Sequence, residues 1–411
     1  MTRRDLGSFA HGQFRVDYED RPDPHALREQ RVAKARAELE AAGLDALLVW
    51  KDENVRFLTG LRAQLIAGKS TQLNGCLLVR DAPPILLCSG GEAQRARVVM
   101  PWIAELHVVP IMEARGLVRA AVERTVAPLL ARHGVARLGL DESAYCQVEA
   151  LRELAPGVEL ADGDAVMQRA RLIKLPEEVA LIEEACAIAE GVLELAVQAI
   201  RPGARETDVV AAAMHELYRL GGELSHVATP FVASGEHMAP PNRIPSDKII
   251  RNGDVVFIDI GAMWSGYFGD IGRTVICGTP SRRQQEVYTA VREALAAATA
   301  ALRAGNTNDD VARAVREAAA ARGFGSSEFI SLFIGHGVGM GANEPPYIGE
   351  DLPGAETVVL EEGMTFAVEP LIWVPGVRGG AGVRLEDTIL VTEDGGRSLT
   401  RAPFDDRLTL A

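Results

Sequence analysis

The sequence predicts an α/β protein built of two domains. At 411 residues, the chain is too long for one ordinary hydrophobic core. In the first half, short apolar runs alternate with helical patterns, which is typical of a mixed or parallel sheet with helices on its faces. In the second half, several residue types recur at a fixed interval, which indicates two related α/β halves.

The elements of the first half follow in order. A helix is expected over residues 26–42, where apolar residues recur at helical spacing before Gly43, a typical helix stop. The expected strands share short, apolar, β-branched sequences and cover residues 45–50, 75–79, 84–88, 106–109 and 137–140. A second helix is expected over residues 117–133, directly before the last of these strands.

A change of texture near residues 172–178 predicts the domain boundary. Pro176 and the acidic residues after it are typical of the first turn of a helix, which we expect to run to about Ile200 and to end at Gly203. We therefore expect an N-terminal extension (1–24), an N-terminal domain (25–170) and a C-terminal domain (174–411).

The internal repeat lies in the C-terminal domain. Five residues recur as the same type 102 positions later: Gly203, Asp208, Val209, Ala212 and Gly221 match Gly305, Asp310, Val311, Ala314 and Gly323. One interpretation is a coincidence between two Ala-rich helices. The other is a duplicated α/β half with a pseudo-two-fold axis, which would place a site where the halves meet.

Composition excludes several classes of function. A net charge of -14 argues against nucleic acid and anionic membrane surfaces as partners. No apolar run is long enough to cross a membrane, and residues 1–22 lack the apolar stretch of a signal peptide. The five cysteines are scattered and never spaced as C-x-x-C, so we expect reduced packing residues in a cytoplasmic protein.

A predicted hairpin contains the first two candidate site residues. Two strand-like segments, 254–260 and 267–277, flank a turn at residues 263–266. If the hairpin is symmetric, Asp259 and Asp270 are direct cross-strand partners, with their Cβ atoms ~4.5–5.5 Å apart. Such a pair of like charges is destabilising unless a cation lies between them. A longer or bulged turn with two solvated aspartates is the alternative.

Three later residues extend the pair. His336 lies between two glycines, Glu369 precedes Pro370 at the end of an apolar strand, and Glu386 lies in a strand expected over residues 382–391. Four carboxylates and one imidazole are compatible with one another if they bind two divalent cations, which favours a hydrolytic metalloenzyme. A satisfied loop histidine and an Arg384–Glu386 ion pair are the alternatives for His336 and Glu386.

The motifs D-x10-D, GHGVG, FAVEP and GVRLEDT together resemble the pita-bread metallopeptidases. That family includes methionine aminopeptidases, Xaa-Pro aminopeptidases, prolidases and the metal-free creatinases. The resemblance covers residues 174–411 and implies an α/β (α+β) pita-bread fold there. Residues 25–170 resemble, more loosely, the creatinase-type N-terminal domain.

The resemblance also implies roles for the five residues. Asp259 chelates one metal, Asp270 and Glu386 bridge two metals, and His336 and Glu369 bind the other, with a hydroxide between the cations. Glu369 also transfers a proton to the leaving amine. The two ions are Mn²⁺, Co²⁺, Fe²⁺ or Zn²⁺. Similar prolidases are homodimers whose N-terminal domain covers the neighbouring subunit's site.

Two positions depart from the family pattern. Asn242 and Asn343 stand where the peptidases have histidines, in their P-H and H-E-x-P segments, and Asn cannot transfer a proton near pH 7. His226 and His237 are the candidates to replace them, His226 as a catalytic residue, with a solvated loop histidine as the alternative for each. The expected substrate contacts are Arg384, Asn242, Asn343, His237 and Tyr267.

We therefore expect a dinuclear hydrolase that cleaves an amide bond in a small Xaa-Pro peptide. The alternative keeps the metals but acts on a small non-peptide molecule, as in creatinase, ectoine hydrolase or sulfoniopropionate lyase. A third hypothesis is a non-enzymatic interaction module on the same fold. The complete set of five ligand residues argues against it.

Overall fold

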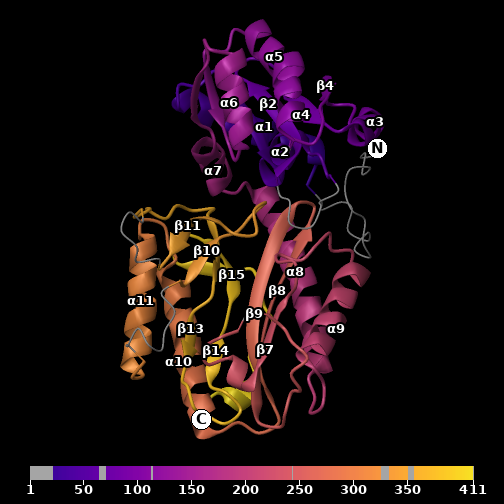
Figure 1. Cartoon of the computed structure of the whole chain (residues 1–411). Coiled ribbons are helices and arrows are strands. Elements are labelled where there is room, and N and C mark those ends of the chain that lie inside the picture. Colours follow the sequence, from indigo (N-terminus) through magenta and orange to yellow (C-terminus); the bar gives the residue numbers. More distant parts are fainter. Residues whose placement is uncertain are drawn as a thin grey trace, which may run out of the picture. The chain divides into compact units, whose positions relative to one another are not determined.

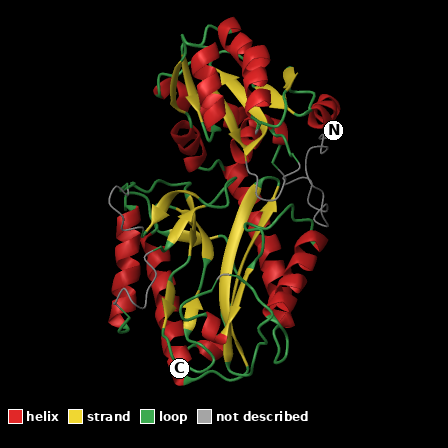
Figure 2. Cartoon of the chain, in the orientation of Figure 1, coloured by secondary structure: helices red, strands yellow, loops and turns green. Residues whose placement is uncertain are grey.

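The computed structural model describes residues 22–63, 71–112, 114–242, 244–324, 333–349 and 356–410. All but the last three residues of the predicted N-terminal extension, residues 1–24, lie outside this range. The chain divides into two compact units between Arg171 and Leu172. Each unit combines helices and strands, so the predicted α/β class is confirmed (Figures 1 and 2).

The first unit is built on a mixed six-stranded sheet in the order β4-β3-β2-β1-β5-β6. Its central strand, β1, pairs antiparallel with β2 and parallel with β5, as expected for alternating strands and helices. The bounds are β1 Ala46–Lys51, β2 Thr71–Val79, β3 Ile85–Cys88, β4 Glu105–Val108, β5 Arg137–Leu140 and β6 Glu159–Asp162.

Seven α-helices accompany this sheet among the described residues. They are α1 Pro24–Ala41, α2 Asp52–Thr59, α3 Gly90–Val99, α4 Arg115–Ala121, α5 Ala127–Arg132, α6 Tyr145–Leu154 and α7 Asp164–Leu172. The Asp23 side chain caps α1, and Gly43 follows it with φ 65°. The helix predicted over 117–133 is observed as α4 and α5 joined by a π-helical turn, η2 (Val122–Val126).

Asp52, at the start of α2, is expected to make the stability of the first unit depend on pH. Burial and the charge of Glu53 raise the pKa of its carboxyl group to about 7. A carboxyl group with a raised pKa stabilises the fold fully at acid pH, and this contribution is lost as the pH rises toward 7. We expect Asp52→Asn to stabilise the unit by ~1–2 kcal/mol at pH 8, with no gain at pH 4, as measured by thermal unfolding.

Asp81 lies in an exposed turn, so Asp81→Asn is the matched control and should change stability by less than about 0.5 kcal/mol at either pH. An Asp52→Asn protein with the same pH dependence of unfolding as the parent would contradict this interpretation.

The second unit contains two matched helix pairs, α8 (Pro176–Ala199) with α9 (Glu206–Arg219), and α10 (Arg282–Ala301) with α11 (Asn308–Ala321). Helices α9 and α11 are both 14 residues long, and both their first and last residues are 102 positions apart. Each follows a glycine of similar backbone geometry, Gly203 (φ 92°) and Gly305 (φ 91°). The predicted repeat is therefore a structural one (Figure 1).

The first half of this unit pairs β7 (Phe231–Ser234), β8 (Asp254–Trp264) and β9 (Tyr267–Cys277), with α8 packed on β8 and β9. The approach of α8 requires Gly269, because a Cβ atom there would lie 2.4 Å from the backbone nitrogen of Cys186. A short 3-10 helix, η3 (Gly235–His237), follows β7.

The second half has a five-stranded sheet in the order β11-β10-β12-β15-β16 and a separate β13–β14 pair. The bounds are β10 Gly335–Gly337, β11 Glu344–Ile348, β12 Thr365–Val368, β13 Leu371–Trp373, β14 Gly382–Arg384, β15 Asp387–Val391, β16 Gly396–Ser398, and a 3-10 helix η4 Asp406–Leu408. The single strand predicted over 382–391 is wrong, because the chain breaks at Leu385-Glu386.

Within the described ranges, no helix combines the length and the apolar character that a membrane span requires.

Candidate metal centre

The β8–β9 hairpin places Asp259 and Asp270 on one face but not directly opposite each other. Ser265 and Gly266 both have positive φ, 49° and 87°, and form a two-residue turn. Asp259 therefore pairs with Gly272, and Asp270 pairs with Gly261. The prediction of direct partners was wrong because it centred the turn one residue too early. The two aspartates are diagonal neighbours, which leaves space between them.

A second hairpin contributes Glu369 and Glu386. The pairs Val368–Asp387 and Leu371–Arg384 belong to one register, which sets Glu369 opposite Glu386. The ladder is open at this point because Pro370 has no N–H group. Glu386 instead exchanges two backbone hydrogen bonds with Gly272 of the first hairpin (2.9 and 3.3 Å).

His336 is fixed by its own strand. Its Nδ1 atom is 2.9 Å from the Gly337 carbonyl oxygen, and its Nε2 atom is 3.5 Å from Glu369 Oε1. A proton on Nδ1 donated to that carbonyl leaves Nε2 with a lone pair for a metal. The glycines beside His336 allow close strand contact, since a Cβ atom at Gly335 would lie 2.4 Å from the Ala367 carbonyl oxygen.

These five side chains converge, and each of the five residues is at most 5% exposed. Their donor atoms form two overlapping groups that fit a metal ion, Asp270–His336–Glu386 and Asp259–Glu369–Glu386. One carboxylate oxygen each of Asp259, Asp270 and Glu386 is buried and has no hydrogen-bond partner in the described structure. Buried carboxylate oxygens without hydrogen-bond donors are suitable ligands for divalent cations, so these five residues fit a metal site.

The pKa shifts show that burial and mutual repulsion disfavour the ionised form of some of these carboxylates. Burial, together with the charge of Asp259, raises the pKa of Asp270, and burial with the charges of Asp259 and Asp270 raises that of Glu386 well above its usual range. Burial also lowers the pKa of His336. Burial would raise the pKa of Asp259, but the charges of Arg384 and His226 outweigh it and lower that pKa. Divalent cations would favour the ionised form of every carboxylate here.

Arg384 lies inside the cluster. Its guanidinium is 3.2 Å from Asp259 and 3.8 Å from Glu386, and it forms an ion pair with Glu369. The alternative in which Arg384 pairs with Glu386 therefore describes part of the structure. The predicted contact of Arg384 with substrate remains a prediction.

Of the two candidate replacement histidines, His226 reaches the cluster. Its Nε2 atom is 3.1 Å from Asp259 Oδ1 and 3.8 Å from Asp270 Oδ1. Burial would lower the pKa of His226, but the charges of Asp270 and Asp259 outweigh it and raise that pKa. His237 instead lies 3.3 Å from Glu206, a buried carboxylate that already accepts hydrogen bonds from Ser234 and Ser246.

The remaining predicted contacts lie elsewhere. Tyr267 is buried and donates a 2.7 Å hydrogen bond to Glu178 of α8, and its contact with substrate remains a prediction. Asn242 is exposed and exchanges two hydrogen bonds with the backbone of Ile244, while Asn343 is exposed next to Glu344, which pairs with Lys174. Contact of the two asparagines with substrate remains a prediction.

Two supporting residues were missed by sequence reasoning. The Thr388 hydroxyl accepts from the Asp270 amide and donates to its carbonyl oxygen (3.0 and 2.7 Å). Arg273 donates to the carbonyl oxygens of Gly272 and Glu386 and pairs with Asp387 at 2.8 Å. Each lies two or three positions from a predicted ligand, and that proximity was the available signal.

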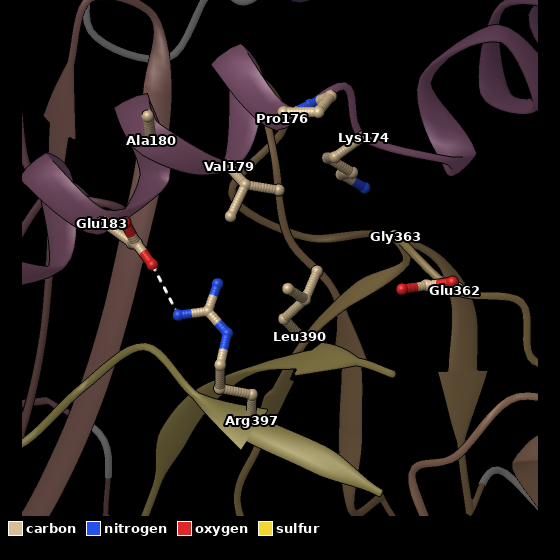
Figure 3. A pocket seen from close by; sticks show the side chains of 9 residues that line it. All are labelled: Lys174, Pro176, Val179, Ala180, Glu183, Glu362, Gly363, Leu390 and Arg397. Carbon is tan, nitrogen blue, oxygen red and sulfur yellow. Dashed lines mark hydrogen bonds and ion pairs between the residues drawn. The ribbon is translucent and has the colours of Figure 1, made fainter. Parts of the chain in front are cut away.

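A separate pocket of about 490 Å³ lies at the start of α8 (Figure 3). It includes none of the predicted site residues. Lys174 and Pro176 lie at one side, and Arg397 and Glu183, which also line the pocket, form an ion pair at 2.7 Å.

The fold and this site define a two-domain metal-dependent hydrolase, and comparison with known families agrees. Residues 180–393 match the metallopeptidase family M24, and residues 31–173 match the creatinase/prolidase N-terminal domain. The chain belongs to the metallopeptidase family M24.

Several Xaa-Pro dipeptidases and prolidases resemble the chain in sequence or in structure. The chain is 30% identical over 376 residues to an Xaa-Pro dipeptidase of Pyrococcus horikoshii, which covers 91% of this chain and 98% of that protein. It is 37% identical over 265 residues to the Xaa-Pro dipeptidase of Pyrococcus furiosus, covering 64% and 73% of the two chains. The crystal structure of the P. horikoshii prolidase matches with a TM-score of 0.76 at 30% identity, covering 91% of this chain and 99% of that one. A Bacillus anthracis Xaa-Pro dipeptidase matches with a TM-score of 0.78 at 26% identity, covering 92% and 99%.

Proposed function

We propose that this protein is an Xaa-Pro dipeptidase that cleaves the amide bond before proline in a small peptide. The observation that supports this most directly is the convergence of five buried side chains, three of which have a buried carboxylate oxygen without a hydrogen-bond partner in the described structure. The Xaa-Pro dipeptidases among its relatives supply the substrate class. They do not favour a non-peptide substrate, so we do not propose that alternative.

We propose Asp259, Asp270, His336, Glu369 and Glu386 as ligands of two divalent cations, which are Mn²⁺, Co²⁺, Fe²⁺ or Zn²⁺. Such cations, when bound, polarise the substrate carbonyl group and lower the pKa of water. The chain's own residues then orient and move protons. Glu369 would accept a proton from the attacking water and pass it to the leaving proline nitrogen, and Arg384 would hold Asp259 through their ion pair.

We further propose that the protein is a cytoplasmic homodimer, with residues 25–170 and 174–411 as its two domains. The free state of all five cysteines supports a reducing compartment. The match of its first part to the creatinase/prolidase N-terminal domain supports the division.

A substrate panel on chelated and metal-reloaded protein tests the function. We expect Xaa-Pro dipeptides to be cleaved. Dipeptides with the same first residue and a second residue other than proline should be cleaved far more slowly. Creatine, a cyclic amidine and a sulfoniopropionate should remain intact. Activity should vanish on chelation and return with Mn²⁺ or Co²⁺. Xaa-Pro cleavage that survives complete chelation, or no Xaa-Pro cleavage with any of the four cations, would overturn the proposal.

A further inference from the structure

The metal-facing side of the β8–β9 hairpin has a repeated pattern of aspartate and glycine. Its two rungs are Asp259–Gly272 and Gly261–Asp270, so each aspartate faces a glycine. The four positions share one face because they alternate along the strands. Each glycine leaves a space that another element can enter.

Glu386 fills the space above Gly272. A Cβ atom at Gly272 would lie 2.8 Å from Glu386 Oε2 and 3.0 Å from Glu386 Cβ, closer than side chains pack. Glycine is thus required for Glu386 to stand beside Asp259 and Asp270, where it acts as a proposed ligand.

His226 fills the equivalent space above Gly261. A Cβ atom at Gly261 would lie 2.5 Å from His226 Cβ and 2.7 Å from its Nδ1. The ring is held edge-on against Phe231, the β7 partner of Asp259, with 6.0 Å between ring centroids. The chain before it is bound to the hairpin, since Glu223 donates to the Met263 carbonyl oxygen and Met263 donates to that of Leu224.

The donor atoms around His226 define a third group suited to a cation. Nε2 of His226, a carboxylate oxygen of Asp259 and one of Asp270 lie within 4.8 Å of one another. The Oδ1 atoms of both aspartates are buried and lack a hydrogen-bond partner in the described structure. The His226 side chain is only 8% exposed, so its nitrogen faces these oxygens rather than solvent.

We propose that His226 is a sixth protein ligand, which binds through Nε2 the cation held by Asp259 and Asp270. This inference rests on the proposed metal site and extends it. The metallopeptidase motif supplies one imidazole, from His336, and His226 adds a second from a segment outside that motif. A second imidazole favours Co²⁺, Zn²⁺ and Fe²⁺ over Mn²⁺, since carboxylates and water suit Mn²⁺ while imidazole suits the other three.

Proton NMR of the Co²⁺-loaded protein tests the assignment without any substitution. Each histidine bound through Nε2 retains an Nδ1 proton close to the paramagnetic ion, and that proton gives a strongly shifted, exchangeable signal. We expect two such signals, from His226 and His336. A single shifted signal at full Co²⁺ loading would overturn the inference while leaving the five-ligand site intact. Failure of the protein to bind Co²⁺ would overturn both.

His226→Phe tests it by metal affinity. Phenylalanine retains a ring above Gly261 but has no nitrogen, and we expect it to weaken Co²⁺ binding at least ~10-fold in equilibrium dialysis, with a smaller loss for Mn²⁺. It should also remove one shifted signal. His237→Phe is the matched control, because His237 lies beside Glu206 outside the cluster, and it should leave both affinities unchanged. Equal Co²⁺ affinity in the two variants would contradict the assignment.

Discussion

Asp270→Asn is expected to reduce kcat for an Xaa-Pro dipeptide by about 10³-fold or more. The amide preserves the size of the side chain and its place in β9. It removes one negative charge from the group that Asp270 forms with His336 and Glu386. Metal chemistry contributes several kcal/mol to hydrolysis, and each 1.36 kcal/mol corresponds to a tenfold change in rate. The measurement is kcat at saturating substrate, with bound metal counted by elemental analysis of the same sample.

Asp394→Asn is the control for this substitution, because Asp394 is exposed in the turn between β15 and β16. It should leave kcat and metal content unchanged. An Asp270→Asn protein that keeps both cations and more than a tenth of the parent kcat would show that Asp270 is not a ligand.

Of the substitutions proposed here, Arg273→Met is expected to lower the free energy of unfolding most, by ~3–5 kcal/mol. Arg273 is buried, pairs with Asp387 and donates to three carbonyl oxygens, those of Gly272, Glu386 and Ala402. Methionine fills a similar volume but leaves a buried carboxylate without its cation, which costs more than the net value of the pair. The measurement is the urea midpoint for unfolding of the second unit, followed by near-UV absorption or amide exchange.

Arg397→Met is the matched control. The Arg397–Glu183 pair has similar length but is 48% and 39% exposed, so water and salt screen it (Figure 3). Its loss should cost less than ~1 kcal/mol. Equal losses in the two variants would show that burial of the Arg273 pair does not govern its contribution.

Much of the architecture could be predicted because local chemistry determines it. The repeat of Gly203 and Gly305 marked the two matched helices, since glycine at positive φ is the residue that fits those turns. The apolar runs of the first unit predicted strands β1 to β5 for the same local reason, but not β6, whose sequence is less apolar. The repeat also predicted a site where the two halves of the second unit meet, and the proposed ligands come from both halves.

What the sequence could not predict depends on contacts between distant segments. The offset of Asp259 and Asp270 follows from the backbone of Ser265 and Gly266, which a symmetric hairpin model does not contain. At the break opposite Pro370, Glu386 bonds instead to Gly272, which is 114 positions earlier, and the sequence does not show this partner. The sequence around Tyr267 also does not show that its hydroxyl donates a hydrogen bond to Glu178 of α8, 89 positions earlier.

The proposed ligands are divided between the two repeated halves, with Asp259 and Asp270 in the first and His336, Glu369 and Glu386 in the second. Neither half can complete a coordination sphere without the other. Bound cations would thus link the two halves of the second unit and stabilise their association, in addition to their part in hydrolysis. A chelator would then weaken the association of the halves as it stops catalysis, so the inactive, metal-free enzyme becomes the form that proteases cut most easily.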